Sequence, residues 1–190
     1  YKRQDFLCER YPALKVVESD IATAYRILED SYKNGGKLLV AGNGGSAADA
    51  EHIVGELMKG FKLPRKPKAD FAEKLIQENA ELGVVLAEKL QGALPAIALD
   101  GHPALSTAYM NDCEPLLCFA QQVNGYGKTG DVFLGISTSG NSKNVLYAAT
   151  TAHAKGMTLG GRPQGRPPVP LSVEAGVDEV DVLLVELFLG

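Results

Sequence analysis

The sequence lacks several features that mark particular classes of protein. No apolar run reaches the roughly 18 residues of a membrane span, and the opening residues, YKRQDFLCERYP, hold no signal-peptide core. The three cysteines (Cys8, Cys113 and Cys118) form no Cys-x-x-Cys pair, which argues against a disulfide framework and a cysteine zinc site; we interpret them as small buried side chains. The formal net charge of −4 offers no overall positive field to a nucleic acid. We therefore expect a cytoplasmic protein that binds neither nucleic acid nor a membrane.

The remaining composition is that of one globular domain. The 190 residues are 45% apolar and 22% charged, which is enough to bury a core and too apolar for a disordered chain. Residues 1–36 are expected to be helical, because apolar side chains recur at intervals of three and four between Leu14 and Leu28. A small domain offers few places to bury this apolar helix face, so we expect the chain to self-associate.

Three short apolar runs predict parallel strands that are buried on both faces: residues 37–41, 95–99 and 132–136. Helices are expected over residues 47–58, 70–91 and 115–123, and from the turn at 137–142 to about residue 155. Residues 62–68 and 111–112 are expected in loops. The alternation of strand and helix predicts a three-layer α/β/α sandwich with a central parallel sheet, preceded by the N-terminal helix.

A turn rich in hydroxyl groups, Ser-Thr-Ser-Gly-Asn-Ser, follows the third predicted strand at residues 137–142. Hydroxyls donate hydrogen bonds to phosphate oxygens, and the start of the next helix adds free N–H groups and the positive end of its dipole. Ser, Thr and Asn also cap helices in ordinary turns. Four hydroxyls within six residues favour a phosphate site over an ordinary cap.

A second turn, Gly-Asn-Gly-Gly-Ser-Ala, follows the first predicted strand at residues 42–47. It matches the dinucleotide pattern G-x-G-x-x-A, but that site also needs an acidic residue about 20 positions further on, where this chain has the loop KLPRKPK. A Gly-Lys-Ser/Thr sequence is absent as well, so no nucleotide cofactor is expected. Parallel strands end at one edge of a sheet, so both turns should face one crevice, with Asn43 and Ser46 approaching a small ligand.

His52 and Glu56 lie four residues apart on the helix after the second turn, hence on one helix face. Both could point towards the crevice, where they would offer a base and a pair of metal ligands. A solvated His/Glu pair on a surface helix has the same spacing, and the two interpretations stay open. Asp112 has several possible roles, of which capping the next helix is the simplest.

Together these motifs resemble the sugar isomerase (SIS) domain of phosphoheptose isomerases. The likeness rests on residues 42–52 with Glu56 and Leu57, on residues 111–112, and on residues 130–142, in that order. It covers roughly residues 1–158, and residues 62–92 resemble the insert of longer-loop members. The resemblance implies a single SIS domain over residues 1–190 that converts sedoheptulose 7-phosphate to a D-glycero-D-manno-heptose 7-phosphate through an enediol(ate). It also implies active sites shared between the subunits of a homotetramer.

The same resemblance implies roles for individual residues. Glu56 matches the general base of the family, and His52 matches a residue that binds zinc in some members, so zinc is the one cofactor implied. The sugar phosphate would be held by Asn43, Gly44, Ser46, Asp112, Ser137, Thr138, Ser139 and Ser142.

Residues 156–190 depart from the family pattern. The family ends with a helix carrying Gln-Glu-x-His and a second histidine, which serve as acid/base and zinc ligands. Here residues 178–181 read Asp-Glu-Val-Asp, so Asp178 and Glu186 would replace the ligands, and Glu186 stands where the second catalytic histidine would be. A non-catalytic SIS module, which binds a phosphosugar or a protein partner as replication-initiation regulators do, therefore stays open as an alternative function.

Overall fold

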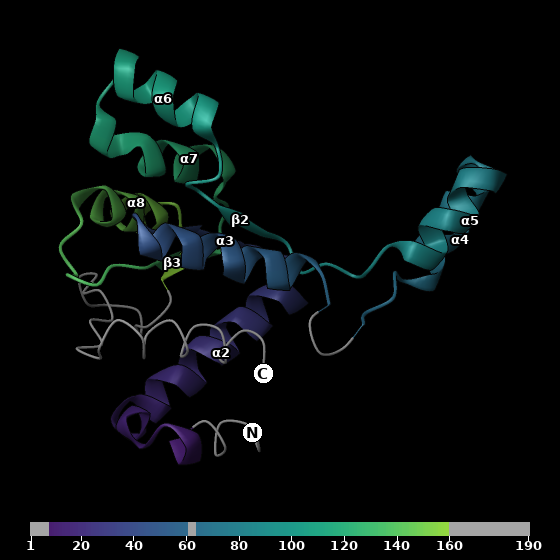
Figure 1. The fold of residues 1–190 in the computed structure, drawn as a ribbon, viewed down its shortest axis with the longest axis horizontal. Coiled ribbons are helices and arrows are strands. Elements are labelled where there is room, and N and C mark those ends of the chain that lie inside the picture. The colour runs from purple at the N-terminus through teal and green to yellow at the C-terminus, as the bar shows by residue number, and fades with distance from the viewer. Residues whose placement is uncertain (1–7, 61–63, 160–190) are drawn as a thin grey trace.

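The computed structural model describes residues 8–60 and 64–159, in which strands and helices alternate (Figure 1). A parallel sheet with the strand order β2-β1-β3-β4 lies at the centre. Its strands are β1 (Leu38–Ala41), β2 (Ala96–Ala98), β3 (Val132–Gly135) and β4 (Thr158–Leu159). Every residue of β1 is buried, as is usual for a central strand covered on both faces. The three strands expected from the sequence are therefore confirmed.

Helices cover both faces of the sheet. The helices α2 (Glu18–Lys33) and α3 (Gly45–Met58) cover one face, and α7 (Cys118–Tyr126) and α8 (Lys143–Ala154) cover the other. Successive residues of β1 point to opposite faces, so Leu38 and Val40 pack against α3, whereas Leu39 and Ala41 pack against α7 and α8. The predicted three-layer α/β/α sandwich is confirmed.

The remaining helices lie outside these layers. The short 3-10 helix η1 (Pro12–Val17) precedes α2, and α6 (Pro103–Asp112) with η2 (Pro115–Leu117) precedes α7. The helices α4 (Ala69–Glu78) and α5 (Ala80–Lys89) form a hairpin that stands away from the sheet (Figure 1). In the part of the chain that the structure describes, no helix combines the length and the apolar character that a membrane span requires.

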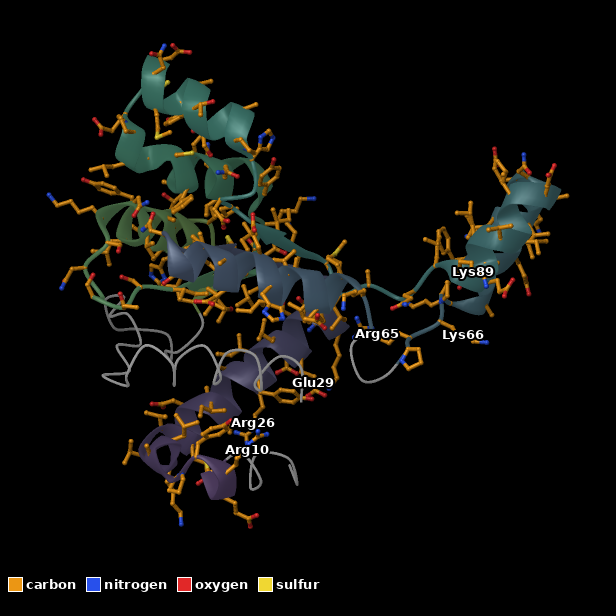
Figure 2. All side chains as sticks on the ribbon, in the orientation of Figure 1. Arg10, Arg26, Glu29, Arg65, Lys66 and Lys89 are labelled. Carbon is orange, nitrogen blue, oxygen red and sulfur yellow. The ribbon has the colours of Figure 1, made fainter. Side chains whose placement is uncertain are left out.

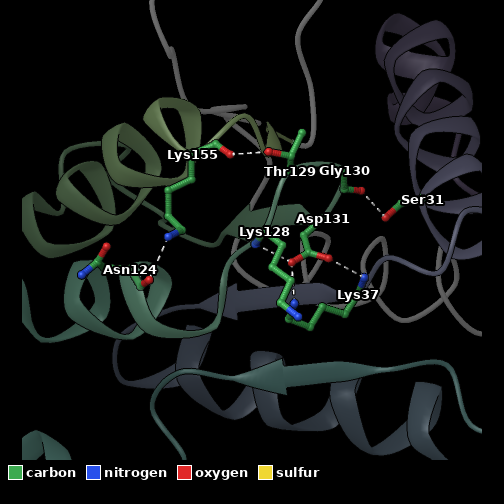
Figure 3. A network of polar contacts seen from close by, with 8 residues as sticks. All are labelled: Ser31, Lys37, Asn124, Lys128, Thr129, Gly130, Asp131 and Lys155. Carbon is green, nitrogen blue, oxygen red and sulfur yellow. Dashed lines mark hydrogen bonds and ion pairs between the residues drawn. The ribbon is translucent and has the colours of Figure 1, made fainter.

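A buried polar network fixes the amino-terminal ends of β1 and β3 (Figure 3). The Asp131 side chain is 4% exposed, and its carboxylate accepts hydrogen bonds from the backbone N–H of Lys37 at 3.0 Å and of Lys128 at 2.8 Å. The Lys37 ammonium group donates to the same carboxylate. The Ser31 hydroxyl donates to the Gly130 carbonyl at 2.7 Å and ties α2 to this corner. These bonds fix the positions of β1, β3 and α2 relative to one another.

The helix expected over residues 70–91 is two helices. The chain leaves the helical conformation at Asn79, whose side-chain oxygen accepts from the N–H groups of Glu81 at 3.1 Å and Leu82 at 2.8 Å and so starts α5. The apolar spacing continues across this break, so periodicity alone did not reveal it.

Residues 111–112 were expected in a loop, but they form the last turn of α6. This helix starts at Pro103, and the His102 ring accepts from the N–H of Leu105 at 3.4 Å. The sequence of α6 has no clear apolar stripe that would predict a helix, and none of its residues is buried in the structure.

Two further expectations are settled in part. Cys8 and Cys118 are buried as expected, but Cys113 is exposed, because it follows the exposed end of α6. Of the atypical segment 156–190, Thr158 and Leu159 join the sheet as β4 beside β3. Asp178 and Glu186 lie outside the described residues.

Candidate functional site

Two turns lie side by side at the carboxyl-terminal edge of the sheet, because β1 and β3 are adjacent and parallel. The side chains of Asn43, in the first turn, and Asn144, just beyond the second, exchange two hydrogen bonds. The Asn43 amide donates to Asn144 Oδ1 at 3.1 Å, and the Asn144 amide donates to Asn43 Oδ1 at 2.7 Å. The sequence-based expectation that both turns share one edge is therefore confirmed.

The glycines of the first turn let the backbone fold closely around the start of α3. A Cβ at Gly42 would lie 2.3 Å from the Ser46 carbonyl oxygen, so a larger residue there would force the turn apart. Gly44 has φ +57°, a conformation that side-chain-bearing residues rarely adopt. No side chain caps the start of α3, and because the helix begins at this edge of the sheet, the positive end of its dipole lies there.

The hydroxyls of the second turn are grouped together. Ser137 Oγ lies 3.0 Å from Ser142 Oγ and 3.5 Å from Ser139 Oγ. Ser142 stands at the N-cap position of α8, but its side chain makes no capping hydrogen bond to the helix. The hydroxyls are therefore directed at one another at a helix start, an arrangement that suits the oxygens of a phosphate group.

Glu56 lies in the last turns of α3, with its side chain 10% exposed. Its Oε1 accepts from the Lys59 ammonium group at 2.9 Å and lies 4.0 Å from His52 Nε2. Its Oε2 is buried and has no hydrogen-bond partner among the described residues. A buried carboxylate oxygen without a donor can accept a proton from a substrate placed against it.

Within one chain, Glu56 and the two turns lie at opposite ends of α3. Glu56 lies eleven positions after Gly45, which corresponds to about 16 Å along the helix axis. Leu57, next to Glu56, accepts through its carbonyl from the N–H of Leu94, which precedes β2, so this end of α3 reaches the opposite edge of the sheet. The structure brings the two turns together but does not bring the Glu56 of the same chain to them.

Asp100 follows β2 at the same edge as the turns and forms a carboxyl pair with Glu51 of α3. Burial raises the pKa of the Asp100 carboxyl, its own backbone N–H lowers it, and the neighbouring Glu51 carboxylate raises it by charge and by a hydrogen bond. Asp100 Oδ1 is buried and unpartnered within the described ranges.

Asp112, predicted to line the site, is exposed at the end of α6, where its Oδ1 accepts from the Asn111 amide at 2.7 Å. Asp112 does not cap the next helix, because Glu114 has that role through its contact with the N–H of Leu116 at 3.5 Å.

Metal ligands are incomplete in residues 8–60 and 64–159, where no three His, Cys, Asp or Glu side chains form a group that could hold a metal ion. His52 and Glu56 supply two candidate ligands, but the Lys59 ammonium group next to Glu56 Oε1 opposes a cation at that oxygen. The described residues therefore do not by themselves form a zinc site.

Two residues that contact the predicted site residues were not identified from the sequence: Lys59, which contacts Glu56, and Asn144, which contacts Asn43. Lys59 could have been found, because it lies three residues after Glu56 on the same helix and such side chains are neighbours. Asn144 could not, because its partner Asn43 is 101 positions away.

Comparison with known proteins points to a single family. The SIS domain family model matches residues 12–81 and 74–161. A phosphoheptose isomerase of Leptospira biflexa is 35% identical over 176 residues, covering 87% of this chain and 78% of that protein. One of Citrifermentans bemidjiense is 41% identical over 150 residues, covering 78% and 65%. The solved structure of a phosphoheptose isomerase from Francisella tularensis is similar with a TM-score of 0.69 and 27% identity, covering 94% of this chain and 86% of that one.

Proposed function

Since this chain belongs to the SIS-domain phosphoheptose isomerase family, we propose that it converts sedoheptulose 7-phosphate into a D-glycero-D-manno-heptose 7-phosphate through an enediol(ate), with Glu56 as general base. Family membership makes the chain a phosphosugar isomerase. The observation that carries the proposal is the pair of turns joined by Asn43 and Asn144, which gathers hydroxyls and two helix starts at one edge of the sheet.

The phosphate is assigned to the hydroxyl-rich turn at residues 137–142. Ser139 and Ser142 both lie within hydrogen-bond reach of Ser137, so the three hydroxyls can reorient from these contacts to a bound phosphate. The start of α8 adds backbone N–H groups and a positive dipole end. Binding a remote phosphate supplies energy that orients the reacting carbons elsewhere in the site. Asn43, Gly44, Ser46, Thr138 and Asp112 are assigned to the remaining contacts with the sugar phosphate.

Glu56 is assigned to proton transfer between the two carbons of the carbonyl end. Its carboxylate removes a proton from the carbon beside the ketone, giving the enediol(ate), and returns it to the former carbonyl carbon. Lys59 holds Oε1 at 2.9 Å, which leaves the buried Oε2 as the proton acceptor. Moving the hydroxyl proton requires a second group, for which Glu186 is the candidate by its position in the family pattern.

The Glu56 that serves a given phosphate turn is assigned to another copy of the chain. Within one copy the length of α3 separates Glu56 from the phosphate turn. A site shared between two copies allows the Glu56 of one copy to act on a substrate whose phosphate is bound by the turn of the other. A homotetramer and a cytoplasmic location belong to the same proposal. Zinc would act as a Lewis acid on substrate oxygens, but the described ligands are incomplete and no step above needs it.

The central test is the conversion of sedoheptulose 7-phosphate by purified Glu56→Gln protein in a coupled assay. We expect kcat to fall about 10²–10⁴-fold, because the amide cannot accept the proton, while the melting temperature still rises with added substrate. Glu29→Gln, which changes an exposed carboxylate on α2, is the control and should retain activity. If Glu56→Gln keeps the wild-type kcat, Glu56 does not act as the general base.

The shared site is tested by mixing two impaired variants and assaying them at a substrate concentration far below the wild-type KM. Glu56→Gln and Ser142→Ala chains, co-expressed with different tags and purified as mixed oligomers, should be more active than the average of the two parents, since some sites then combine an intact Glu56 with an intact turn. Mixed oligomers with only the average activity of the two parents would contradict a site built from two copies.

A further inference from the structure

The hairpin of α4 and α5 has no core of its own. The two helices pack closely at Gly83, where an added Cβ would lie 2.0 Å from the Leu75 carbonyl oxygen. Gly83 is the only buried residue in either helix. The hairpin is joined to the sheet through the non-helical residues 64–68 and 90–95 and stands apart from the other helices (Figure 1). Helices of ten residues are only marginally stable when nothing packs on them.

Large apolar side chains cover this hairpin on its outside. Their exposed fractions are 49% for Phe71, 41% for Ile76, 60% for Leu82, 51% for Val84, 54% for Val85, 40% for Leu86 and 42% for Leu90. Leu82, Val85 and Leu86 follow a three-and-four spacing, so they form one stripe along α5. A contiguous apolar surface of this kind marks a contact with another molecule.

The charges of the hairpin are divided between its two ends. The tip, residues 77–82, carries Glu78 and Glu81 and no basic residue. The base, residues 65–70 and 88–90, carries four basic side chains against two acidic ones. Figure 2 shows Lys66 and Lys89 at this base, beside the links to the sheet. The hairpin is therefore acidic at one end and basic at the other, and between them the exposed apolar side chains are joined by one charge of each sign, Glu73 and Lys74.

We propose that this hairpin binds the same hairpin of a second copy of the chain, in antiparallel orientation, to form a four-helix bundle. A two-fold contact brings one surface against itself, and the antiparallel arrangement places each acidic tip beside the basic base of its partner. The apolar stripes then cover each other in the middle. A parallel arrangement would bring Glu78 and Glu81 of both copies together, which repulsion disfavours.

The base of the hairpin is attached to the end of α3 that carries Glu56. The Arg65 guanidinium group donates to the carbonyls of Leu57 at 2.8 Å and Lys59 at 2.9 Å, and also to that of Gly92 at 2.7 Å. These bonds fix the direction in which the hairpin leaves the domain, so a pairing of hairpins also sets how two domains are oriented. This interface does not depend on the proposed reaction.

The apolar contact is tested by measuring the mass of the full chain by light scattering and sedimentation over a range of concentrations. Val85→Glu and Leu86→Glu alter exposed side chains in the middle of α5, so the domain should fold, which circular dichroism checks. We expect self-association to weaken roughly tenfold or more in each, because a charge then enters the contact. Met110→Glu, an equally exposed apolar position on α6, is the matched control and should keep the wild-type mass.

The antiparallel arrangement is tested by reversing the charges of one end at a time. A tip variant (Glu78→Lys with Glu81→Lys) and a base variant (Lys66→Glu with Lys68→Glu) should each self-associate less than the wild type. Mixing them should restore association, since every tip then meets a base of opposite charge. The proposal is overturned if the wild type is monomeric throughout, if Val85→Glu and Leu86→Glu match Met110→Glu, or if the mixture associates no better than its components.

Discussion

Asn43 and Asn144 exchange two side-chain hydrogen bonds of 3.1 and 2.7 Å across 101 positions of sequence. Asn144 Oδ1 also accepts from the N–H of Val145 at 3.0 Å, which fixes its side chain at the start of α8. The Gly-rich turn after β1 is therefore held in place by the helix that follows the hydroxyl-rich turn. This contact makes the two turns a single unit.

Replacing Asn144 should disturb substrate binding more than chemistry. We expect Asn144→Ala to raise KM for sedoheptulose 7-phosphate about tenfold with a smaller change in kcat, because Asn43 loses both hydrogen bonds that orient it while Glu56 is untouched. Steady-state kinetics measure this. Asn34→Ala, which removes a surface amide at the end of α2, is the control, and an equal rise in KM there would argue against a specific role for Asn144.

The hydroxyl cluster should be needed for the phosphate rather than for the fold. We expect Ser137→Ala and Ser142→Ala each to raise KM about tenfold and to reduce the stabilisation by inorganic phosphate in thermal-shift titrations. Thr150→Val, further along α8, is the control, since its hydroxyl only donates to the Leu146 carbonyl. Unchanged phosphate titrations in both serine variants would place the phosphate elsewhere.

Loss of the Asp131 carboxylate should destabilise the domain strongly. Asp131→Ala leaves two backbone N–H groups and the Lys37 ammonium group without their shared acceptor, so we expect the free energy of unfolding to fall by about 2–4 kcal/mol. Urea denaturation measures the change. Glu29→Ala removes an exposed ion pair with Lys33 and should cost less than about 0.5 kcal/mol, which makes it the control. Similar losses in the two variants would contradict the importance of the network.

Asp100 should make the domain less stable as the pH rises. Burial raises its pKa above the ordinary value of 3.8, so the folded chain binds the proton more tightly than the unfolded chain. Its contribution to stability is full below pH 3.8, is lost as the pH rises through the folded pKa, and stays lost above it. Asp100→Asn should therefore raise the melting temperature at pH 7, and the difference from wild type should vanish in acid.

The control for this prediction is Asp20→Asn, which changes a carboxyl in the first turn of α2. Thermal melts of both variants from pH 3 to pH 8 make the comparison. A gain in Asp100→Asn that is the same at every pH would show that the carboxyl pair is not its cause.

The sequence was sufficient for those features that arise from nearby residues. Buried strands such as Leu38–Ala41 are continuous apolar runs, and the alternation with amphipathic helices leaves few ways to cover both faces of a sheet. The turns after β1 and β3 were found for the same reason, since Gly, Ser and Asn favour turns through local geometry. The break at Asn79 and the helix α6 were missed, because neither changes the pattern of apolar residues.

The sequence by itself thus determined the fold class, the two turns and the spacing of His52 and Glu56, all of which depend on contacts between residues close along the chain. The length of α3 alone also separates Glu56 from the turn that starts this helix. The prediction that Glu56 and both turns share one crevice did not take this length into account. Only the tertiary structure paired Asn43 with Asn144 and left the α4–α5 hairpin uncovered. Such relationships depend on which distant surfaces meet when the sheet forms, and no local pattern of residues encodes them.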